Sequence, residues 1–352
     1  MNFWQACLKN QISPGEWGIY GSDFEGRSDE SGFVLSSWVF DEFIRDEFNG
    51  RREEFRFSSK RTFAEWCEEH GLAHPMTFGV WGETSETEEE QVLEAIEGGR
   101  RKREFDNLAL KPLEASHGDG LKFLSLPTEE GEVARRLLRR RLNEEVTRTG
   151  GESAVLVQER LSQHADYAAP HPHSINTIRV VTFRKNTGEV EIDGAVWRMG
   201  RKGSIVDSWR RGGLAAGVDI ETGEVGSAHQ LVESGVEWFE EHPDTGSAIV
   251  GRSLPGWSDV LEAARRGAEA VEGPRWLGWD VVMSTDGPVL LEVNHGWALP
   301  IMLVHRGGKV PRDWAERLRE IDREELLEDR IRPLRFLWYL STALRERLLR
   351  EL

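Results

Sequence analysis

A β-hairpin pattern near residue 285 constrains the fold of this chain more than any other feature: two apolar runs, LGWDVVM and PVLLEVN, flank a short polar segment. Three side chains with hard oxygen donors interrupt these runs, namely Asp280, Glu292 and Asn294. Glu292 and Asn294 are two residues apart, so they share one face of their strand. Because magnesium prefers carboxylate and amide oxygens, the hairpin is a candidate metal site; the alternative is a polar strand face that points to solvent.

The length of the turn decides whether the three donors converge. A three-residue loop at 285–287 would put glycine at the left-handed position and pair Asp280 with Glu292. A two-residue Asp-Gly loop would instead pair Asp280 with Val293 and separate the donors. We expect the three-residue loop.

Lys111 is a second candidate, because it follows the apolar strand NLAL and precedes a proline that ends the strand. Five residues later, the run Ser116-His117-Gly118-Asp119-Gly120 offers backbone N–H groups that phosphate oxygens could approach. The spacing differs from that of a GxxxxGK[ST] loop, and a glycine-containing hairpin turn explains the run equally well.

Arg179 and Arg198 lie on the two strands of another predicted hairpin, NTIRVVTF and EVEIDGAVW, with a turn at 186–188. Strand alternation groups each arginine with apolar residues: Arg198 with Val190, Ile192 and Val196, and Arg179 with Val181 and Phe183. An arginine on an apolar face needs a carboxylate or a phosphate as its partner. A structural ion pair and a phosphate site are both open, and for Arg198 we favour phosphate because RMGRKG runs into a glycine-rich loop.

Other segments predict further helices and strands. A helix capped by Ser59 and ended by Gly71 is expected, and the acidic GETSETEEEQVLEAIEGG and basic EEGEVARRLLRRRLNEEV also read as helices with solvated or acid-paired faces. AVLVQERL predicts a strand, and the tail from Arg312 predicts a helix with one leucine stripe.

Composition excludes several classes of protein. The net charge of −17, from 45 basic and 62 acidic residues, argues against a general nucleic-acid-binding protein. The sequence contains no run of about 18 apolar residues, so we expect no membrane span. The first residues also lack the apolar core of a secretory signal. With Cys7 and Cys67 as the only cysteines, neither a disulfide framework nor a four-cysteine zinc site can form. We expect a cytoplasmic protein without nucleic-acid or membrane partners.

In chain order these segments resemble an ATP-grasp enzyme. The matching features are Lys60 before a helix, Lys111 before a glycine loop, a strand ending in Val157-Gln158-Glu159-Arg160, the Asn176-Thr177-x-Arg179 strand, and the terminal Asp280, Glu292 and Asn294 set. Three stretches are similar to the sugar-transfer-associated branch in particular: HSINTIRVVTF, VWRMGRKGSIVDSWRRGGL and GWDVVMSTDGPVLLEVN. The resemblance implies two α+β lobes that enclose a nucleotide. The implied divisions are an N-terminal region at 1–58 (substrate side or cap), the ATP-grasp domain at 59–305 with its lid lobe at about 105–160, and a helical tail at 306–352.

The resemblance also implies a role for each candidate residue. The phosphates would contact Lys60 and Lys111 under a loop that contains Ser116, His117, Gly118 and Gly120. Adenine would contact Gln158, Glu159, Arg160 and Leu161. The ribose would lie near Glu159 or Asp166. Arg61 and His164 are alternatives to Lys60 and Asp166. Magnesium would be held by Asp280, Glu292 and Asn294, and the catalytic set would be Asn176, Arg179 and Arg198.

The implied activity is an ADP-forming ligation that uses ATP and magnesium. A carboxylate would become an acyl-phosphate, which an amine or a thiol would then attack. The expected partners are a small-molecule or peptide substrate with a carboxylate and an amine co-substrate. Two alternatives stay open: an ATP-grasp kinase that phosphorylates a hydroxyl, and a nucleotide-binding scaffold without turnover.

Overall fold

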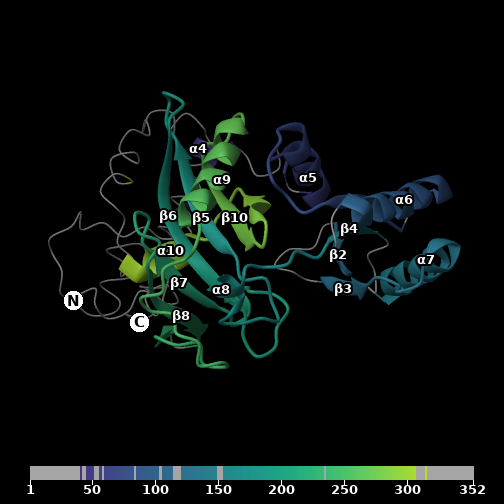
Figure 1. Ribbon diagram of the computed structural model, residues 1–352. Helices are drawn as coiled ribbons and strands as arrows, with labels where there is room; N and C mark the ends of the chain where they lie inside the picture. The colour runs from purple at the N-terminus through teal and green to yellow at the C-terminus, as the bar shows by residue number, and fades with distance from the viewer. Residues whose placement is uncertain are drawn as a thin grey trace, which may run out of the picture.

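Two antiparallel sheets organise the chain (Figure 1). The structure is a computed structural model that describes residues 40–41, 45–50, 55–57, 59–82, 85–102, 105–113, 120–148, 154–233, 235–306 and 314. The smaller sheet has the strand order β1-β4-β2-β3, and the larger has the order β11-β10-β5-β6-β7-β8-β9. Helices and sheets are thus segregated as in an α+β protein, as the sequence predicted.

The smaller sheet and its two helices form one lobe. Its elements are β1 (Thr77–Trp81), α6 (Glu86–Lys102), β2 (Asn107–Pro112), β3 (Lys122–Ser125), α7 (Gly131–Arg148) and β4 (Val155–Glu159). Leu108 and Leu110 of β2 point into the core beneath the helices, so Lys111 faces the opposite side of the sheet. The basic face of α7 is acid-paired, because Arg135 and Arg139 bind glutamates of α6.

The larger sheet forms the second lobe. Its strands are β5 (Ile178–Arg184), β6 (Val190–Met199), β7 (Leu214–Val218), β8 (Val225–Val232), β9 (Gly235–Phe239), β10 (Trp276–Ser284) and β11 (Gly287–Asn294). The helices around it are α4 (Arg45–Asn49), α5 (Lys60–Glu69), α8 (Ala165–Ala168), η4 (Trp209–Arg211), α9 (Trp257–Ala270), α10 (Leu299–Leu303) and η5 (Val304–Arg306).

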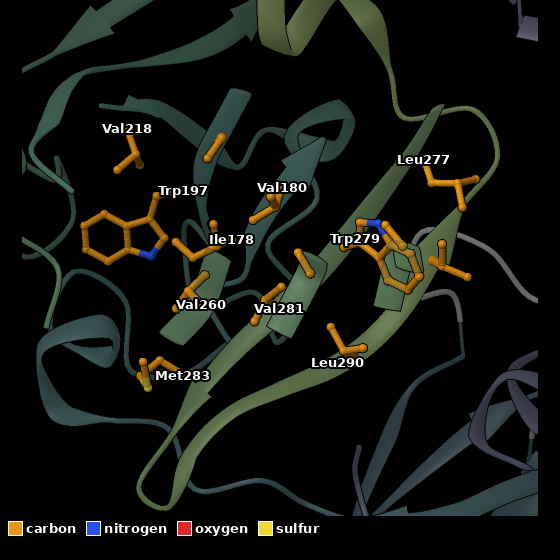
Figure 2. Packing of buried hydrophobic residues seen from close by; sticks show 14 of the residues in the cluster. Ile178, Val180, Trp197, Val218, Val260, Leu277, Trp279, Val281, Met283 and Leu290 are labelled. Atoms are coloured by element: carbon orange, nitrogen blue, oxygen red, sulfur yellow. The ribbon is translucent and has the colours of Figure 1, made fainter. Parts of the chain in front are cut away.

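The main core lies between this sheet and α9. Figure 2 shows Val260 of α9 among inward side chains of the central strands, including Ile178, Val180 and Val281. A second cluster covers the other face of the sheet, where the buried Trp276 and Trp297 pack edge to face against Phe40 and Trp314. Burial on both faces leaves the strands little freedom to shift register, which holds polar residues at fixed positions along them.

The connection between the lobes is anchored to the tip of the β10–β11 hairpin. Gln163 forms an isolated bridge with Ser284, and the N–H of Thr285 donates to the carbonyl of Ser162 at 3.0 Å. The N–H of His164 likewise donates to the carbonyl of Met283 at 2.9 Å. The segment after β4 is therefore tied to the same hairpin that carries the predicted metal ligands.

The helix predicted after Ser59 is confirmed as α5. The Ser59 hydroxyl accepts a hydrogen bond from the Arg61 N–H at 3.3 Å, and the chain turns at Gly71, which has a φ of +61°. Phe63, Trp66 and Cys67 are buried along one face, as their spacing predicted.

Some expectations fall outside the described residues. These are the loop residues Ser116, His117 and Gly118, the N-terminal region at 1–58 apart from 40–41, 45–50 and 55–57, and the helical tail at 306–352 apart from Arg306 and Trp314. Among the residues that are described, no helix is both long and apolar enough to cross a membrane.

Candidate functional site

The β10–β11 hairpin places Asp280 directly opposite Glu292, but by a different route from the predicted one. Ser284 pairs with Gly287 across a two-residue turn, so the expected three-residue loop is wrong. The register shifts between Asp280 and Val281, because Val281 pairs with Leu290 and leaves Leu291 as a β-bulge. The extra residue in β11 compensates for the shorter turn.

Asp280 is the buried centre of the site. It is only 2% exposed and lies opposite Arg179 of the neighbouring strand β5. Arg179 binds both carboxylate oxygens, with Nη2 donating to Oδ2 at 3.1 Å and Nε donating to Oδ1. Arg198 of β6 reaches the same carboxylate, its Nη2 donating to Oδ2 at 2.8 Å. Burial alone would raise the pKa of Asp280, but the two guanidinium groups hold it well below its usual range.

Both arginines therefore have protein carboxylates as partners. The structure shows the ion pair for Arg179, and for Arg198 it shows Asp280 together with Asp207, whose Oδ2 lies 3.6 Å from Arg198 Nε. The remaining nitrogen of Arg198, Nη1, makes no hydrogen bond with any residue in the described part of the chain.

The predicted surroundings of Arg198 are wrong in part. Val181 pairs with Gly194 and Thr182 pairs with Ile192, so Asp193 is a bulge in β6. Alternation changes phase at that residue, and Val190 and Ile192 contribute to the core on the other face of the sheet. Arg198 shares its face with Val196, which lies opposite Arg179.

Two lysines and a second carboxylate surround this centre. Burial raises the pKa of Glu292, and the negative charge of Asp280 raises it further. Burial lowers the pKa of Lys111 to about 8, against the attraction of Glu292 and with an added repulsion from Lys60. Lys60, the first residue of α5, donates from Nζ to the carbonyl of Pro112 at 3.2 Å. The site thus collects charged groups from α5, both sheets and the hairpin.

The donor set fits a magnesium ion. Asn294 donates from Nδ2 to Glu292 Oε1 at 3.2 Å, which places the amide beside that carboxyl group. The pKa of Glu292 is raised first by burial and then by the adjacent charge of Asp280, and a divalent cation would relieve that repulsion. Within the described ranges there is no cluster of three or more His, Cys, Asp and Glu residues that could hold a metal ion.

A cavity of about 360 Å³ lies where the two lobes meet. Its lining residues are Phe105, Asp106, Asn107 and Phe123 from the smaller lobe, and Arg160–Gln163, Ala168, Pro172, Ser174 and Ile175 from the connection and the larger lobe. The guanidinium of Arg160 lies 4.1 Å from the ring centre of Phe123, and Leu161 packs against Val282 and Val289. Of the residues expected near adenine, Arg160 and Leu161 line this cavity.

Gln158 and Glu159 are not among the residues that line the cavity. Gln158 donates from Nε2 to Thr77 Oγ1 at 2.8 Å, and its buried Oε1 accepts no hydrogen bond within the described part. Glu159 Oε1 accepts from the N–H of Met76 at 3.0 Å. The free acceptor of Gln158 is the polar atom in this group that a ligand could satisfy.

The remaining predicted residues are placed differently. Asp166 is exposed on α8, 3.6 Å from His164 Nδ1 and 3.9 Å from Arg252 Nη1, and is not part of the cavity lining. Asn176 is fully buried, and its amide binds the carbonyls of Tyr167 and His171 as well as the Ser174 hydroxyl. Asn176 therefore orders the chain before β5. Gly120 has a φ of +68° and lies against Pro112, where a Cβ would approach the ring to 2.6 Å.

Sequence reasoning missed Asp207. Its Oδ2 accepts from the backbone N–H and the hydroxyl of Thr177, at 2.9 Å and 2.6 Å. The sequence could have indicated this residue, because Asp207 is the only acid between Arg198 and Gly212 and so the only carboxylate in that segment that could pair with a nearby arginine.

Comparison with known proteins identifies the family. The family model described as sugar-transfer associated ATP-grasp matches residues 40–317. Similar solved structures include D-alanyl-alanine synthetase A from Vibrio cholerae, at 11% identity and a TM-score of 0.39, with 68% of this chain and 54% of that chain covered. D-cycloserine synthetase DcsG matches at 16% identity and a TM-score of 0.39, with 74% of this chain and 70% of that one covered.

A RimK domain ATP-grasp protein from Sphaerobacter thermophilus matches at 16% identity and a TM-score of 0.33, with 67% and 58% covered. This chain spans about half the length of the Vibrio protein, 54% of it. No curated protein sequence matches the chain. Because the family model covers most of its length, and as the sequence predicted, the chain belongs to the sugar-transfer-associated ATP-grasp family and has the α+β ATP-grasp fold.

Proposed function

We propose that this chain is an ATP-dependent, ADP-forming ligase that activates a carboxylate as an acyl-phosphate for attack by an amine or a thiol. One observation carries the proposal: cations from three elements, Lys111, Arg179 and Arg198, gather around the carboxyl groups of Asp280 and Glu292. Such a mixed cluster suits a magnesium-bound triphosphate, whose charge must be neutralised as a phosphoryl group transfers.

The nucleotide would lie along the junction between the lobes. Adenine would enter the cavity beside Arg160 and Leu161. For its amino group we propose Gln158 as the acceptor, since its Oε1 has no hydrogen-bond partner within the described part, although the residue is not in the cavity lining. Lys60 and Lys111 would bind the phosphates, together with the loop at 116–120. For the ribose we propose Asp166, because it is exposed, whereas Glu159 is buried and accepts from Met76.

Asp280, Glu292 and Asn294 would hold magnesium, which supplies positive charge at the phosphate oxygens. Arg179 would keep Asp280 ionised and fixed in place. Arg198 would present Nη1 to the transferring phosphoryl group. Lys111 would neutralise charge from the smaller lobe.

The reaction needs no covalent nucleophile from the protein. A substrate carboxylate oxygen would bond to the γ-phosphorus while the bond from that phosphorus to the bridging oxygen breaks, releasing ADP. The amine or thiol would then bond to the acyl carbon, and inorganic phosphate would leave with the electron pair of the carbon–oxygen bond. The protein's contribution is to position the reactants and to neutralise charge.

The test supplies magnesium, ATP, a panel of small carboxylates and hydroxylamine as a surrogate amine. We expect ADP, phosphate and a hydroxamate in equal amounts, each dependent on the carboxylate. A stable phosphorylated product without free phosphate would identify a kinase instead. Nucleotide binding without ADP formation across the panel would identify a scaffold. The Glu292→Gln variant is the control for contaminating activity.

A further inference from the structure

The hydroxyl of Thr177 lies between the carboxylate of Asp207 and the guanidinium of Arg198. It donates to Asp207 Oδ2 at 2.6 Å and accepts from Arg198 Nε at 2.9 Å. The backbone N–H of Thr177 donates to the same Asp207 oxygen at 2.9 Å. Thr177 is only 2% exposed, so bulk water does not compete for these bonds.

This arrangement determines where Arg198 points. A guanidinium is a planar fork of donors, so fixing two of its nitrogens fixes the direction of the third. The Thr177 hydroxyl accepts from both Nε and Nη2, and Asp280 also accepts from Nη2, while Nη1 has no hydrogen bond within the described residues. Without the Thr177 hydroxyl, Asp280 would be the only side chain hydrogen-bonded to the guanidinium among the described residues, because Asp207 Oδ2 is 3.6 Å from Nε, and the fork could rotate about that contact.

The Asp207 carboxylate is itself held in place. It lies in the loop between β6 and η4. Gly213, which follows η4, packs against this loop so closely that a Cβ there would lie 2.9 Å from the carbonyls of Asp207 and Met199. At the start of the same loop, the N–H of Gly200 donates to Asn176 Oδ1 at 3.2 Å. The loop is thus fastened at both ends, and Asp207 offers its oxygen to Thr177 from a fixed position.

We propose that Thr177 and Asp207 are positioning residues that aim Arg198 Nη1 at the transferring phosphoryl group; the proposal rests on the proposed function. The Thr177 hydroxyl acts as a neutral relay that accepts from the arginine and donates to the acid. Asp207 supplies the negative charge that strengthens this chain of hydrogen bonds.

A purely structural role for Thr177 and Asp207, in which they only hold β5 to the loop, predicts a different result. Their loss would then lower the stability of the apo protein and weaken the binding of every ligand by the same factor. Loss of a positioning device would weaken most the ligand that resembles the transition state, because only that ligand needs the aimed charge.

The experiment compares Thr177→Val with Thr177→Ser. Valine keeps the branched shape and lacks the hydroxyl, whereas serine keeps the hydroxyl and lacks the methyl; both retain the backbone N–H to Asp207. Calorimetry measures the affinity for two probes: the magnesium complex of the non-hydrolysable analogue AMPPNP, and MgADP with aluminium fluoride, which mimics the transferring phosphoryl group. Thermal melting of each apo variant is recorded alongside.

We expect Thr177→Val to lose about tenfold in affinity for the aluminium fluoride complex and about threefold or less for AMPPNP. Thr177→Ser should stay within about twofold of the wild type for both probes, and Asp207→Asn should behave like Thr177→Val. Equal losses for the two probes, or equal losses in the valine and serine variants, would overturn the positioning role. A wild-type protein that binds the aluminium fluoride complex no tighter than AMPPNP would overturn the proposed phosphoryl transfer itself, which is a separate result.

Discussion

Arg179 and Asp280 lie opposite each other on paired strands, and the arginine binds both oxygens of the carboxylate. Arg198 adds a third hydrogen bond to the same group from the next strand. One buried acid therefore binds two cations, but in unequal ways. Arg179 is bidentate, and its Nη1 also donates to the carbonyl of Trp297 at 3.2 Å. Arg198 instead divides its hydrogen bonds between Asp280 and Thr177.

This inequality predicts different effects on apo stability. Arg179→Ala leaves Asp280 buried with a single partner and should cost about 3–5 kcal/mol. Arg198→Ala leaves the bidentate pair intact, and should cost about 1.5–3 kcal/mol, the range for a hydrogen bond to a charged group. Urea unfolding of the two apo variants measures both values. Equal losses would show that Asp280 does not depend on Arg179 more than on Arg198. Both variants should lose nearly all ATP turnover.

Glu292→Gln tests the metal site. The substitution keeps the shape of the side chain but removes a charge, so magnesium-dependent ATP turnover should fall by about 10²–10³, or ~3–4 kcal/mol of transition-state stabilisation. Apo melting should be unchanged or slightly raised, because burial and Asp280 already disfavour the charged form of Glu292. Turnover equal to that of the wild type would exclude Glu292 from the metal ligands.

Local patterns were sufficient for several elements of the fold. The Ser59 cap and the burial of Phe63 and Trp66 depend on residues within one helix, and the structure confirms them. The turn at 186–188 is confirmed as well, since the N–H of Lys185 donates to the carbonyl of Glu189 at 2.8 Å across it. In each case the decisive interactions lie within a few residues of one another.

The two β-bulges show what local patterns could not supply. Alternation assumes an unbroken ladder, yet Leu291 and Asp193 each interrupt one. A bulge is selected by packing on both faces of the sheet, which no period-two pattern contains. The prediction that Asp280 lies opposite Glu292 is therefore confirmed, although the turn from which it was derived is wrong. The prediction that Val190 and Ile192 share a face with Arg198 is wrong because of the second bulge.

The partners of Arg198 could not be predicted from the sequence for a related reason. Thr177 and Asp207 are 21 and 9 positions away from it in the chain, and the loop that carries Asp207 has no regular period. Only the folded loop brings that carboxylate beside the start of β5.

Lys111 predicts a pH dependence of nucleotide binding. Burial lowers its pKa to about 8, so the ammonium is already present below that pH and is lost above it. Phosphate needs the charged form. The affinity for magnesium AMPPNP should be flat below about pH 8 and should fall by up to about tenfold per pH unit above it, as binding takes up a proton. Calorimetry in buffers of different ionisation enthalpy measures the affinity and the proton uptake. Proton uptake that stays at zero on the alkaline side would contradict this role.

Lys111→Met should separate phosphate binding from adenine binding. The variant loses the charge but keeps an apolar side chain of similar length, so the affinity for ATP should fall at least about tenfold while that for adenosine changes little. Lys122→Met is the matched control, because Lys122 is exposed on the adjacent strand β3. Equal weakening of ATP and adenosine in the Lys111 variant would point to damaged packing of the smaller lobe instead.

Gly278 lies where the hairpin, Arg179 and Trp297 meet. A Cβ built there would overlap Cβ of Trp297 and would come within 3.1 Å of Arg179 Cδ. Because Trp297 is fully buried and packs against Trp276, it has little room to move. Gly278→Ala should therefore cost about 1–3 kcal/mol of stability.

The same change should also displace Arg179 from Asp280, so that ATP turnover falls further than the loss of folded protein explains. Gly226→Ala is the matched control in another strand, since its nearest neighbour, the carbonyl of Gly217, is 3.6 Å away; we expect it to stay within about 0.5 kcal/mol of the wild type. Urea unfolding and turnover per folded molecule are measured on both variants. If Gly278→Ala is as stable and as active as the control, then contact with Trp297 does not hold Arg179 in register with Asp280.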